Sequence, residues 1–113
     1  MADDCLFCRI ARGEIPAKII AEDATCIAFR DVNPQAPVHV LVVPRAHVAS
    51  LNEVTSPALL ADVMQMAREV AKQEEIAVGG YRVVFNTNAD GGQSVGHLHA
   101  HVLGGRRMGW PPG

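Results

Sequence analysis

The chain has 113 residues, of which 49% are hydrophobic and 19% are charged, and its net charge is −2. This composition excludes intrinsic disorder, and the length predicts one compact domain over residues 1–113 with a core of its own. The ten basic residues form no stripe among the twelve acidic ones, which argues against a nucleic-acid partner.

The first half of the chain predicts a short helix and three strands. A helical turn is expected before Gly13 and the step from Ile15 to Pro16, where the backbone is turned out of the helix. Short β-branched runs on either side of an acidic pair predict a β-hairpin, and VHVLVV before Pro44 is the most strand-like run. The predicted helix covers residues 6–11, the hairpin 17–21 and 25–30, a proline-punctuated loop 31–37 and the third strand 38–43.

The second half predicts one long helix followed by two strands. The helix begins at Ser56 and Pro57, an N-cap residue before a proline, and Gly79 and Gly80 are expected to stop it. Its apolar stripe follows a spacing of three and four: Leu60, Val63, Ala67, Val70 and Ala71. Strands are expected at 81–85 and 97–103, a polar loop at 86–92 and an irregular tail at 104–113. The fold class is therefore α+β, a largely antiparallel sheet of about five strands with one long helix and a short N-terminal one.

Cysteine usage and targeting signals suggest a compartment. Three cysteines, in a chain that starts with acidic residues unlike those of a signal peptide, favour reduced thiols or a metal site over disulfides. No apolar run approaches the roughly 20 residues that span a bilayer. We therefore expect a cytoplasmic protein with no membrane partner.

Three of the five histidines alternate with apolar residues, at His97, His99 and His101. On a strand, all three imidazoles would project from one face, and His39 alternates in the same way on another strand. Two interpretations remain open at this point. A pair of these imidazoles chelates a metal ion, or one is a nucleophile while its neighbours position a phosphate.

Two further motifs accompany the histidines. The run from Asp90 to Ser94 contains Gly91 and Gly92, which let backbone N–H groups approach an anion. Cys5-x-x-Cys8 has the spacing of a pair of metal ligands, whereas Cys26 lies in an apolar strand and is expected in the core.

Several segments carry a resemblance to a known family. His97-Leu-His99-Ala-His101-Val-Leu resembles the signature of the histidine-triad superfamily. The segments Glu14–Ile20, Asp31–Pro37, Asp90–Val95 and Leu103–Gly113 resemble its Hint branch, the nucleoside phosphoramidate hydrolases. The resemblance covers essentially the whole chain, and it implies a fold of the histidine-triad type.

By this resemblance the protein is an enzyme that cleaves the P–N bond of purine nucleoside 5′-phosphoramidates. His99 attacks phosphorus and forms a covalent nucleotidyl-histidine, which water then hydrolyses. The implied catalytic residues are His99, His101, His39 and Ser94, and no catalytic metal is required. The implied nucleotide-binding residues are Phe7, Ile10, Phe29, Asp31, Val32, Asn86, Gly92, Gln93, Ser94, Val95, His99, His101 and Trp110.

Within that set, the resemblance gives several residues specific tasks. Asp31 matches the carboxylate that binds ribose, and Gln93, Ser94 and His101 are expected to donate to phosphate oxygens. Arg30 replaces a histidine found in relatives. The partner is a purine nucleotide, an AMP or GMP conjugate.

The resemblance also implies a structural metal and an assembly. Cys5, Cys8, His47 and His97 match the four ligands of a structural zinc in some members of the superfamily. Hint-like proteins are homodimers in which the tail reaches the partner's active site, and the segment Trp110–Gly113 matches that tail.

Three alternatives remain open from the sequence. The chain could hydrolyse dinucleoside polyphosphates, as relatives in the superfamily do. It could be a nucleotide-binding regulatory module whose catalysis is incidental, or a metallohydrolase whose zinc is held by the histidine triad itself. Neither the leaving group nor the preference between adenine and guanine can be read from the residues.

Overall fold

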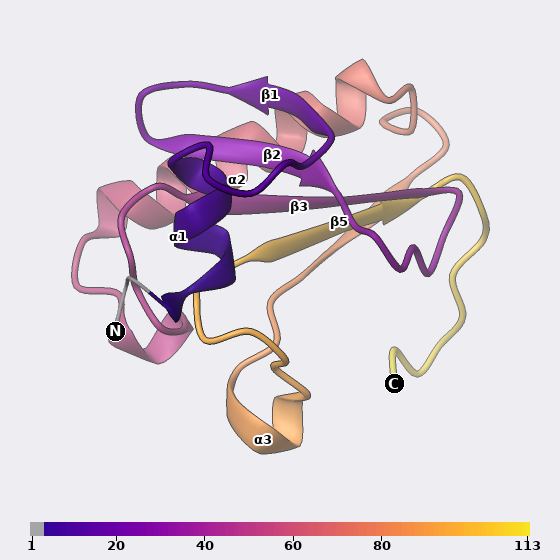
Figure 1. Ribbon diagram of the computed structural model, residues 1–113. Helices are drawn as coiled ribbons and strands as arrows, with labels where there is room; N and C mark the ends of the chain where they lie inside the picture. Colours follow the sequence, from indigo (N-terminus) through magenta and orange to yellow (C-terminus); the bar gives the residue numbers. More distant parts are fainter. Residues whose placement is uncertain (1–3) are drawn as a thin grey trace.

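The computed structural model describes residues 4–113 as a five-stranded antiparallel sheet with helices on both faces (Figure 1). The strands lie in the order β1-β2-β3-β5-β4, so β1 and β4 are the edges. This confirms the predicted α+β class. The elements are α1 (Leu6–Ala11), β1 (Ile19–Glu22), β2 (Cys26–Arg30), β3 (Val38–Pro44), the 3-10 turn η2 (Leu51–Glu53), α2 (Pro57–Gln73), β4 (Tyr81–Val84), α3 (Asn88–Gly91) and β5 (Ala100–Gly104).

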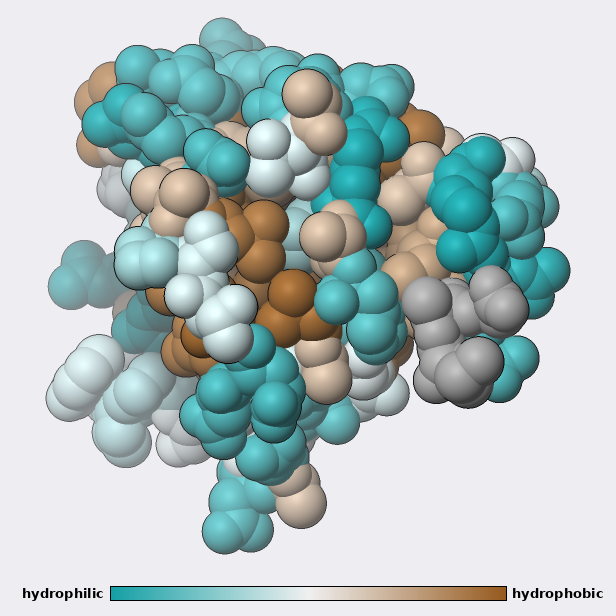
Figure 2. Space-filling view, turned by 90° about the vertical axis from the view of Figure 1, so that its left-hand side faces the viewer, coloured by the Kyte–Doolittle hydropathy of each residue, from teal (hydrophilic) through white to brown (hydrophobic). Residues whose placement is uncertain are grey.

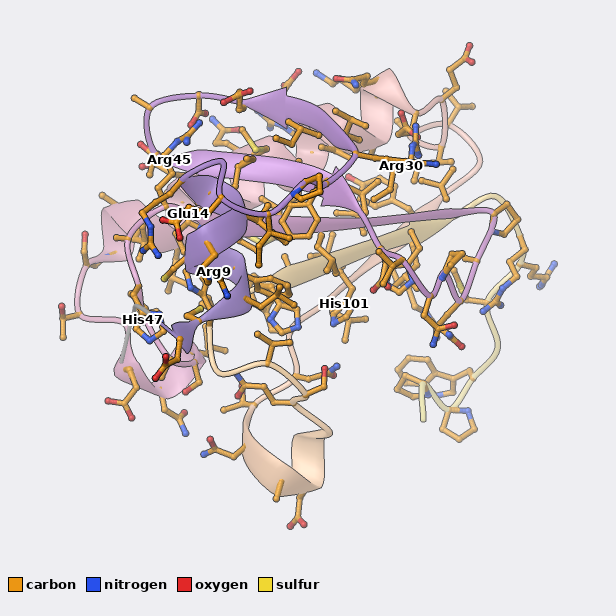
Figure 3. All side chains as sticks on the ribbon, viewed as in Figure 1. Arg9, Glu14, Arg30, Arg45, His47 and His101 are labelled. Carbon is orange, nitrogen blue, oxygen red and sulfur yellow. The ribbon has the colours of Figure 1, made fainter. Side chains whose placement is uncertain are left out.

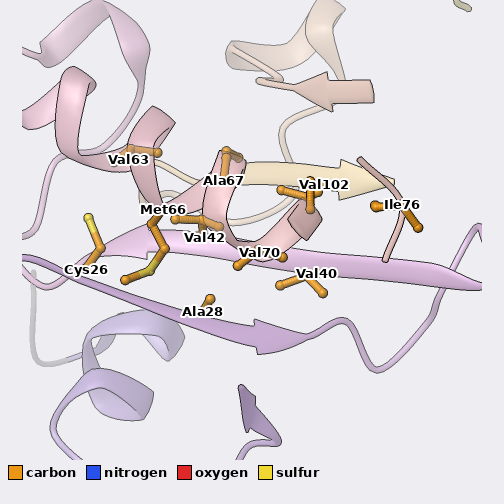
Figure 4. Packing of buried hydrophobic residues seen from close by; sticks show 12 residues of the cluster. Cys26, Ala28, Val40, Val42, Val63, Met66, Ala67, Val70, Ile76 and Val102 are labelled. Atoms are coloured by element: carbon orange, nitrogen blue, oxygen red, sulfur yellow. The ribbon is translucent and has the colours of Figure 1, made fainter. Parts of the chain in front are cut away.

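The sheet divides its side chains between two cores because alternate residues of a strand point to opposite faces. One face packs against α2, whose apolar stripe meets Cys26, Val40 and Val102 (Figure 4). The other face packs against α1, where Phe7 and Ile10 meet Phe29 and the partly polar row of β3. Since Val40 faces α2, His39 and Leu41 face α1.

The same alternation decides where two histidines go. Leu41 of β3 pairs with His101 of β5, while Ala100 and Val102 turn toward α2. His39 and His101 therefore share the α1 face of the sheet.

The end of the long helix differs from the prediction. The long helix ends at Gln73, before Gly79 and Gly80, because Glu75 adopts a left-handed φ of 60° and Ile76 turns back into the core. That return needs Gly104, where a Cβ would lie 2.6 Å from Ile76 Cδ1.

The segment before the last strand also differs from the prediction. The polar loop predicted at 86–92 contains the short helix α3, which is capped by Gly92 with a φ of 76°. The last strand begins at Ala100, three residues later than expected, because Leu98 donates its amide hydrogen to the Val48 carbonyl at 2.7 Å instead of to a neighbouring strand. The three triad imidazoles therefore do not project from one strand face.

Candidate active site and metal centre

A cleft of about 880 Å³ opens between α1, the α1 face of the sheet and the loops around it, a size typical of small-molecule sites. Its apolar part is built from α1 and strands β2 and β3, and its polar part from the ends of β3 and β5. The cleft brings together the following site residues expected from the sequence: Phe7, Ile10, Phe29, Asp31, Val32, His39, Ser94, Val95, His99 and His101.

Four expected nucleotide-binding residues do not line this cleft: Asn86, Gly92, Gln93 and Trp110. Gln93 instead donates its side-chain amide hydrogens to the carbonyls of Ala49, at 2.7 Å, and Val95, at 2.9 Å. Its Oε1 accepts from the Asn88 amide. Trp110 is 83% exposed, and its ring stacks below the guanidinium of Arg82 on β4.

Other residues line the cleft that the sequence argument did not assign. Leu41 could have been found, because it lies two residues from His39 and so shares its face. Lys18 and Arg30 add two cations to the lining, and Arg30 is held by Glu74 at 2.6 Å. No pattern in the sequence could have placed Lys18 in the cleft, because it precedes an ordinary hairpin strand.

His99 is buried in the polar part of the cleft, with one ring nitrogen already committed. Its Nδ1 donates to the backbone carbonyl of His97 at 2.7 Å. A carbonyl can only accept, so Nδ1 carries the hydrogen and Nε2 retains a lone pair. The Phe7 ring packs edge-on against His99, at 5.1 Å between centroids. The lone pair of Nε2 is what a nucleophile at this position requires.

His39 and His101 form a hydrogen-bonded chain with a fixed direction. The backbone amide of Gln35 donates to His39 Nδ1 at 3.0 Å, so the hydrogen of the neutral ring lies on Nε2. That Nε2 donates to His101 Nδ1 at 2.9 Å, with an Asp31 oxygen 3.3 Å away. The hydrogen of His101 must then lie on its Nε2. Among the described residues 4–113, this is the one buried side-chain nitrogen or oxygen with no partner in the protein.

Both rings of this chain are neutral at neutral pH. Burial, together with the neighbouring His99 and His39, lowers the pKa of His101 to about 4, against the opposing effect of Asp31. Burial also lowers the pKa of His39, against the opposing effect of Asp31. His101 therefore offers an uncharged N–H donor beside His99, with 4.9 Å between the ring centroids.

A second cluster lies on the other side of α1 and contains Cys5, Cys8, His47 and His97. His47 and His101, one from each cluster, flank α1 in Figure 3. The Cys8 Sγ lies 3.2 Å from His47 Nδ1 and 3.4 Å from His97 Nδ1, and the Cys5 Sγ lies 3.3 Å from His97 Nδ1. The two imidazole nitrogens are 3.2 Å apart. Four ligand atoms thus converge on one point.

The chemistry of these four donors fits a zinc-like ion. Tetrahedral coordination at about 2.0–2.3 Å places ligand atoms roughly 3.3–3.8 Å apart, close to the observed separations. His97 Nε2 donates to the Pro44 carbonyl at 2.8 Å, which leaves the Nδ1 lone pair directed at the cluster. Burial lowers the pKa of His97, which favours the neutral ring that a metal requires. Cys5, Cys8, His47 and His97 therefore form a set of donors suited to a zinc-like ion.

Ligand atoms of Asp31, His39 and His101 also lie within 4.8 Å of one another. The Gln35 amide nevertheless places a hydrogen on His39 Nε2, the atom that would have to bind the ion. This trio fits a hydrogen-bond chain and not a metal site.

Comparisons with known proteins show which family the chain is similar to. The model of the HIT domain family matches residues 12–108. The chain is 43% identical over 111 residues to the purine nucleoside phosphoramidase of Escherichia coli, an alignment that covers 96% of this chain and 93% of that protein. In structure it is similar to a HIT family hydrolase from Legionella pneumophila Philadelphia 1, with a TM-score of 0.95 and 51% identity over 97% of this chain and 100% of that one.

A second similar structure is that of a zinc-bound protein. It is the Zn-bound histidine triad family protein from Mycobacterium smegmatis, with a TM-score of 0.84 and 29% identity over 100% of this chain and 82% of that one.

Proposed function

Since the chain belongs to the HIT domain family and is a hydrolase of that family, we propose that it cleaves purine nucleoside 5′-phosphoramidates through a nucleotidyl intermediate on His99. The observation that carries the proposal is the hydrogen bond from His99 Nδ1 to the His97 carbonyl, which leaves Nε2 with a lone pair in the cleft. The name of the Escherichia coli relative supports the substrate class.

The reaction proceeds in two displacements at phosphorus. His99 Nε2 forms a bond to phosphorus as the P–N bond of the substrate breaks, and the amine leaves with a proton taken from its surroundings. Water then attacks the same phosphorus and loses a proton to solvent, the bond to Nε2 breaks, and the nucleoside monophosphate is released with His99 restored. The His101 Nε2–H, which has no partner among the described residues, donates to a phosphate oxygen in both steps.

The nucleoside occupies the rest of the cleft. The apolar part around Phe7, Ile10 and Phe29 accepts the purine ring, and these side chains are already ordered in a core cluster. Asp31 accepts from the ribose hydroxyls with the oxygen that the Asn33 amide does not hold. Ser94 is exposed at the cleft wall, where it meets the phosphate or the leaving group.

The four-ligand cluster holds a structural zinc ion, and the reaction needs no catalytic metal. Cys5, Cys8, His47 and His97 would supply all four ligands, so a bound ion has no open position for substrate or water. The Zn-bound relative from Mycobacterium smegmatis supports the choice of metal. When bound, the ion contributes cross-linking of α1 to the segments that carry His47 and His97.

The protein acts as a homodimer formed through β4 and α2. Strand β4 is a sheet edge, and a small hollow of about 330 Å³ lies between it and α2, lined by apolar side chains such as Met64 and Val83. The exposed Trp110 of the tail, stacked on Arg82 of strand β4, contacts the second copy in this dimer, because a ring of this size is rarely left in solvent. A different face of the molecule, shown in Figure 2, has an apolar patch surrounded by hydrophilic side chains.

The remaining expectations concern location and domain structure. Among the described residues, no helix is both long and apolar enough to cross a membrane. A cytoplasmic location and a single domain over residues 1–113 stay predictions.

Trapping the intermediate tests the function. Adenosine 5′-phosphoramidate is mixed with the protein, the reaction is quenched within one turnover, and peptides are mapped by mass spectrometry. We expect an added nucleotidyl group on His99 and none in the His99→Asn variant, which can still be tested for AMP binding. Turnover with no adduct on any histidine, or an adduct on His101, would contradict the mechanism.

A further inference from the structure

His97 belongs to both clusters at once. Its imidazole lies in the sulfur-containing cluster, within 3.4 Å of both thiols and of His47 Nδ1. Its backbone carbonyl faces the other way and accepts the Nδ1 hydrogen of His99 at 2.7 Å. The atom that selects the reactive tautomer of His99 is therefore part of a metal-ligand residue.

The segment 47–49 makes a second connection, through three successive residues. His47 enters the cluster with its ring. The Val48 carbonyl accepts the amide hydrogen of Leu98 at 2.7 Å, and the Ala49 carbonyl accepts a side-chain hydrogen of Gln93 at 2.7 Å. One short segment thus holds both the peptide before His99 and the loop that carries Ser94.

The helix α1 makes a third connection. Its N-cap residue Cys5 and its buried Cys8 are both in the cluster, and Phe7 between them packs edge-on against the rings of His97 and His99. Each of these three connections ends on the nucleophile or its loop, and each begins at a residue of the four-ligand cluster.

We propose that the four-ligand cluster positions the catalytic step: a divalent metal ion held there fixes the His97 carbonyl and the segment 47–49, and these fix the tautomer of His99 and the place of Ser94. His97 and Gln93 are positioning residues, since neither needs to touch the substrate. This inference rests on the proposed function and adds a dependence of the chemistry on metal occupancy.

The proposal separates binding from chemistry. The purine part of the cleft is formed by Phe7, Ile10 and Phe29 together with Leu41, all in the core between α1 and the sheet. Phe7 touches the His97 ring, whereas Phe29 and Leu41 are paired with each other across strands β2 and β3 and are held by the sheet. Loss of the metal should therefore slow attack on phosphorus, which is sensitive to misplacement of about 1 Å, while nucleotide affinity changes little.

Cys5→Ser is the sharpest variant for this test. Cys5 caps α1 by accepting the Cys8 amide hydrogen on its sulfur, and serine is a good N-cap residue, so the helix keeps its cap while the site loses a thiolate ligand. Cys26→Ala is the matched control, because Cys26 is a fully buried cysteine outside the cluster. Chelator-treated wild type with Co²⁺ added back completes the set.

Three quantities are measured on the folded proteins. These are the rate of adduct formation in a single turnover, the dissociation constant of AMP, and the ring nitrogen shifts of His99 in ¹⁵N spectra. Without metal, we expect the adduct to form at least about tenfold more slowly, as when the groups that orient metal ligands are removed at other sites. AMP affinity should stay within about threefold. His99 should show mixed tautomers, and Co²⁺ should restore the single tautomer and the rate in wild type.

The outcomes separate the two proposals. Equal adduct rates and one His99 tautomer with and without metal would overturn the positioning inference and leave the hydrolase standing. No adduct in any form of the protein would overturn the proposed function, while the tautomer spectra would still report on the inference.

If Cys5→Ser and chelator-treated wild type both unfold, the Gln93→Met variant tests the positioning inference instead. This variant keeps all four ligands but removes the hydrogen bond to Ala49, together with those to Val95 and from Asn88. We then expect adduct formation about tenfold slower, at full metal content and unchanged AMP affinity. An unchanged adduct rate in this variant would overturn the inference.

Discussion

The two histidine clusters differ in which backbone group binds the outer ring nitrogen. In the sulfur-containing cluster, His97 donates from Nε2 to the Pro44 carbonyl, so the nitrogen facing the cluster has a lone pair. In the cleft, His39 accepts from the Gln35 amide on Nδ1, so the nitrogen facing the cluster has a hydrogen. A carbonyl behind the ring produces a metal ligand, and an amide behind the ring produces a proton donor.

This contrast shows that convergence of ligand atoms does not by itself identify a metal site. Both clusters bring ligand atoms within 4.8 Å of one another. Their partners in the surrounding backbone decide whether those atoms have lone pairs to give to an ion or hydrogens to give to a substrate. The cleft cluster offers a substrate the hydrogen on the buried His101 Nε2, and the sulfur-containing cluster offers an ion its lone pairs.

The largest expected effect is at His99, the proposed nucleophile beside the cleft cluster. His99→Ala removes the only ring whose lone pair is proposed to attack phosphorus, and we expect turnover to fall by about 10⁴-fold or more. AMP should still bind, because the apolar part of the cleft is unchanged. Steady-state kinetics and calorimetric titration measure the two quantities. Turnover within tenfold of wild type would show that the cleft works without a covalent step.

The next effect tests the sulfur-containing cluster as a metal centre. Cys8→Ser replaces a buried thiolate ligand, and we expect the free energy of unfolding of the metal-loaded protein to fall by about 3 kcal/mol or more. Chelator should destabilise wild type but leave the variant's urea curve unchanged. If chelator has no effect on wild type, the cluster is held by hydrogen bonds alone.

Much of the fold follows from local pattern, but the link between the clusters does not. Alternation in residues 38–43 predicted the orientation of His39, and the same rule accounts for Leu41 on that face, because strand periodicity depends only on neighbouring residues. The rule failed at His97, because the Leu98 amide bonds to Val48 and the His97 ring lies among the other three ligands, so the strand begins only at Ala100. The three ligands are 50 to 92 residues away from His97 along the chain, so no local pattern reports them.

The candidate site divides in the same way. Side-chain identities suggested the lining of the cleft, through the family resemblance, and the four possible metal ligands. The backbone groups of Pro44 and Gln35, which decide the role of each cluster, carry no signal because almost every residue offers an amide and a carbonyl. Gln93 was expected to contact phosphate but donates to the Ala49 carbonyl instead. The sequence could not show this, because a side-chain amide gives no sign of which acceptors surround it.

Acid should distinguish the cleft cluster. The pKa of His101 is about 4 in the folded protein, mainly because of burial, and 6.5 is its ordinary value. Between these values the unfolded chain binds more protons, so the stabilising contribution is complete above pH 6.5 and is lost as pH falls toward 4. The expected loss is about 1 kcal/mol for each pH unit.

Urea unfolding of wild type and His101→Gln across this range measures that loss. The acid release of metal from the thiolates is common to both proteins and cancels in the difference between their free energies. Parallel pH profiles would mean that His101 is already protonated in the folded protein or stays accessible to water.

The smallest expected effect is the most specific, because it alters one backbone hydrogen. Gln35→Pro removes the amide that donates to His39 Nδ1, while Gln35→Ala keeps that amide and serves as the matched control. The proline variant frees His39 to hold its hydrogen on Nδ1. The hydrogen-bond chain to His101 then loses its fixed direction, and we expect turnover to fall about tenfold.

The same change should convert the cleft cluster toward the chemistry of the sulfur-containing one. With a lone pair on His39 Nε2, the atoms of Asp31, His39 and His101 become able to bind an ion together. We expect Gln35→Pro to take up a second equivalent of Co²⁺ and to be inhibited by it, whereas wild type and Gln35→Ala take up one. A second equivalent in all three proteins would mean that the Gln35 amide does not decide the role of the cleft histidines, and that proximity of ligands is sufficient.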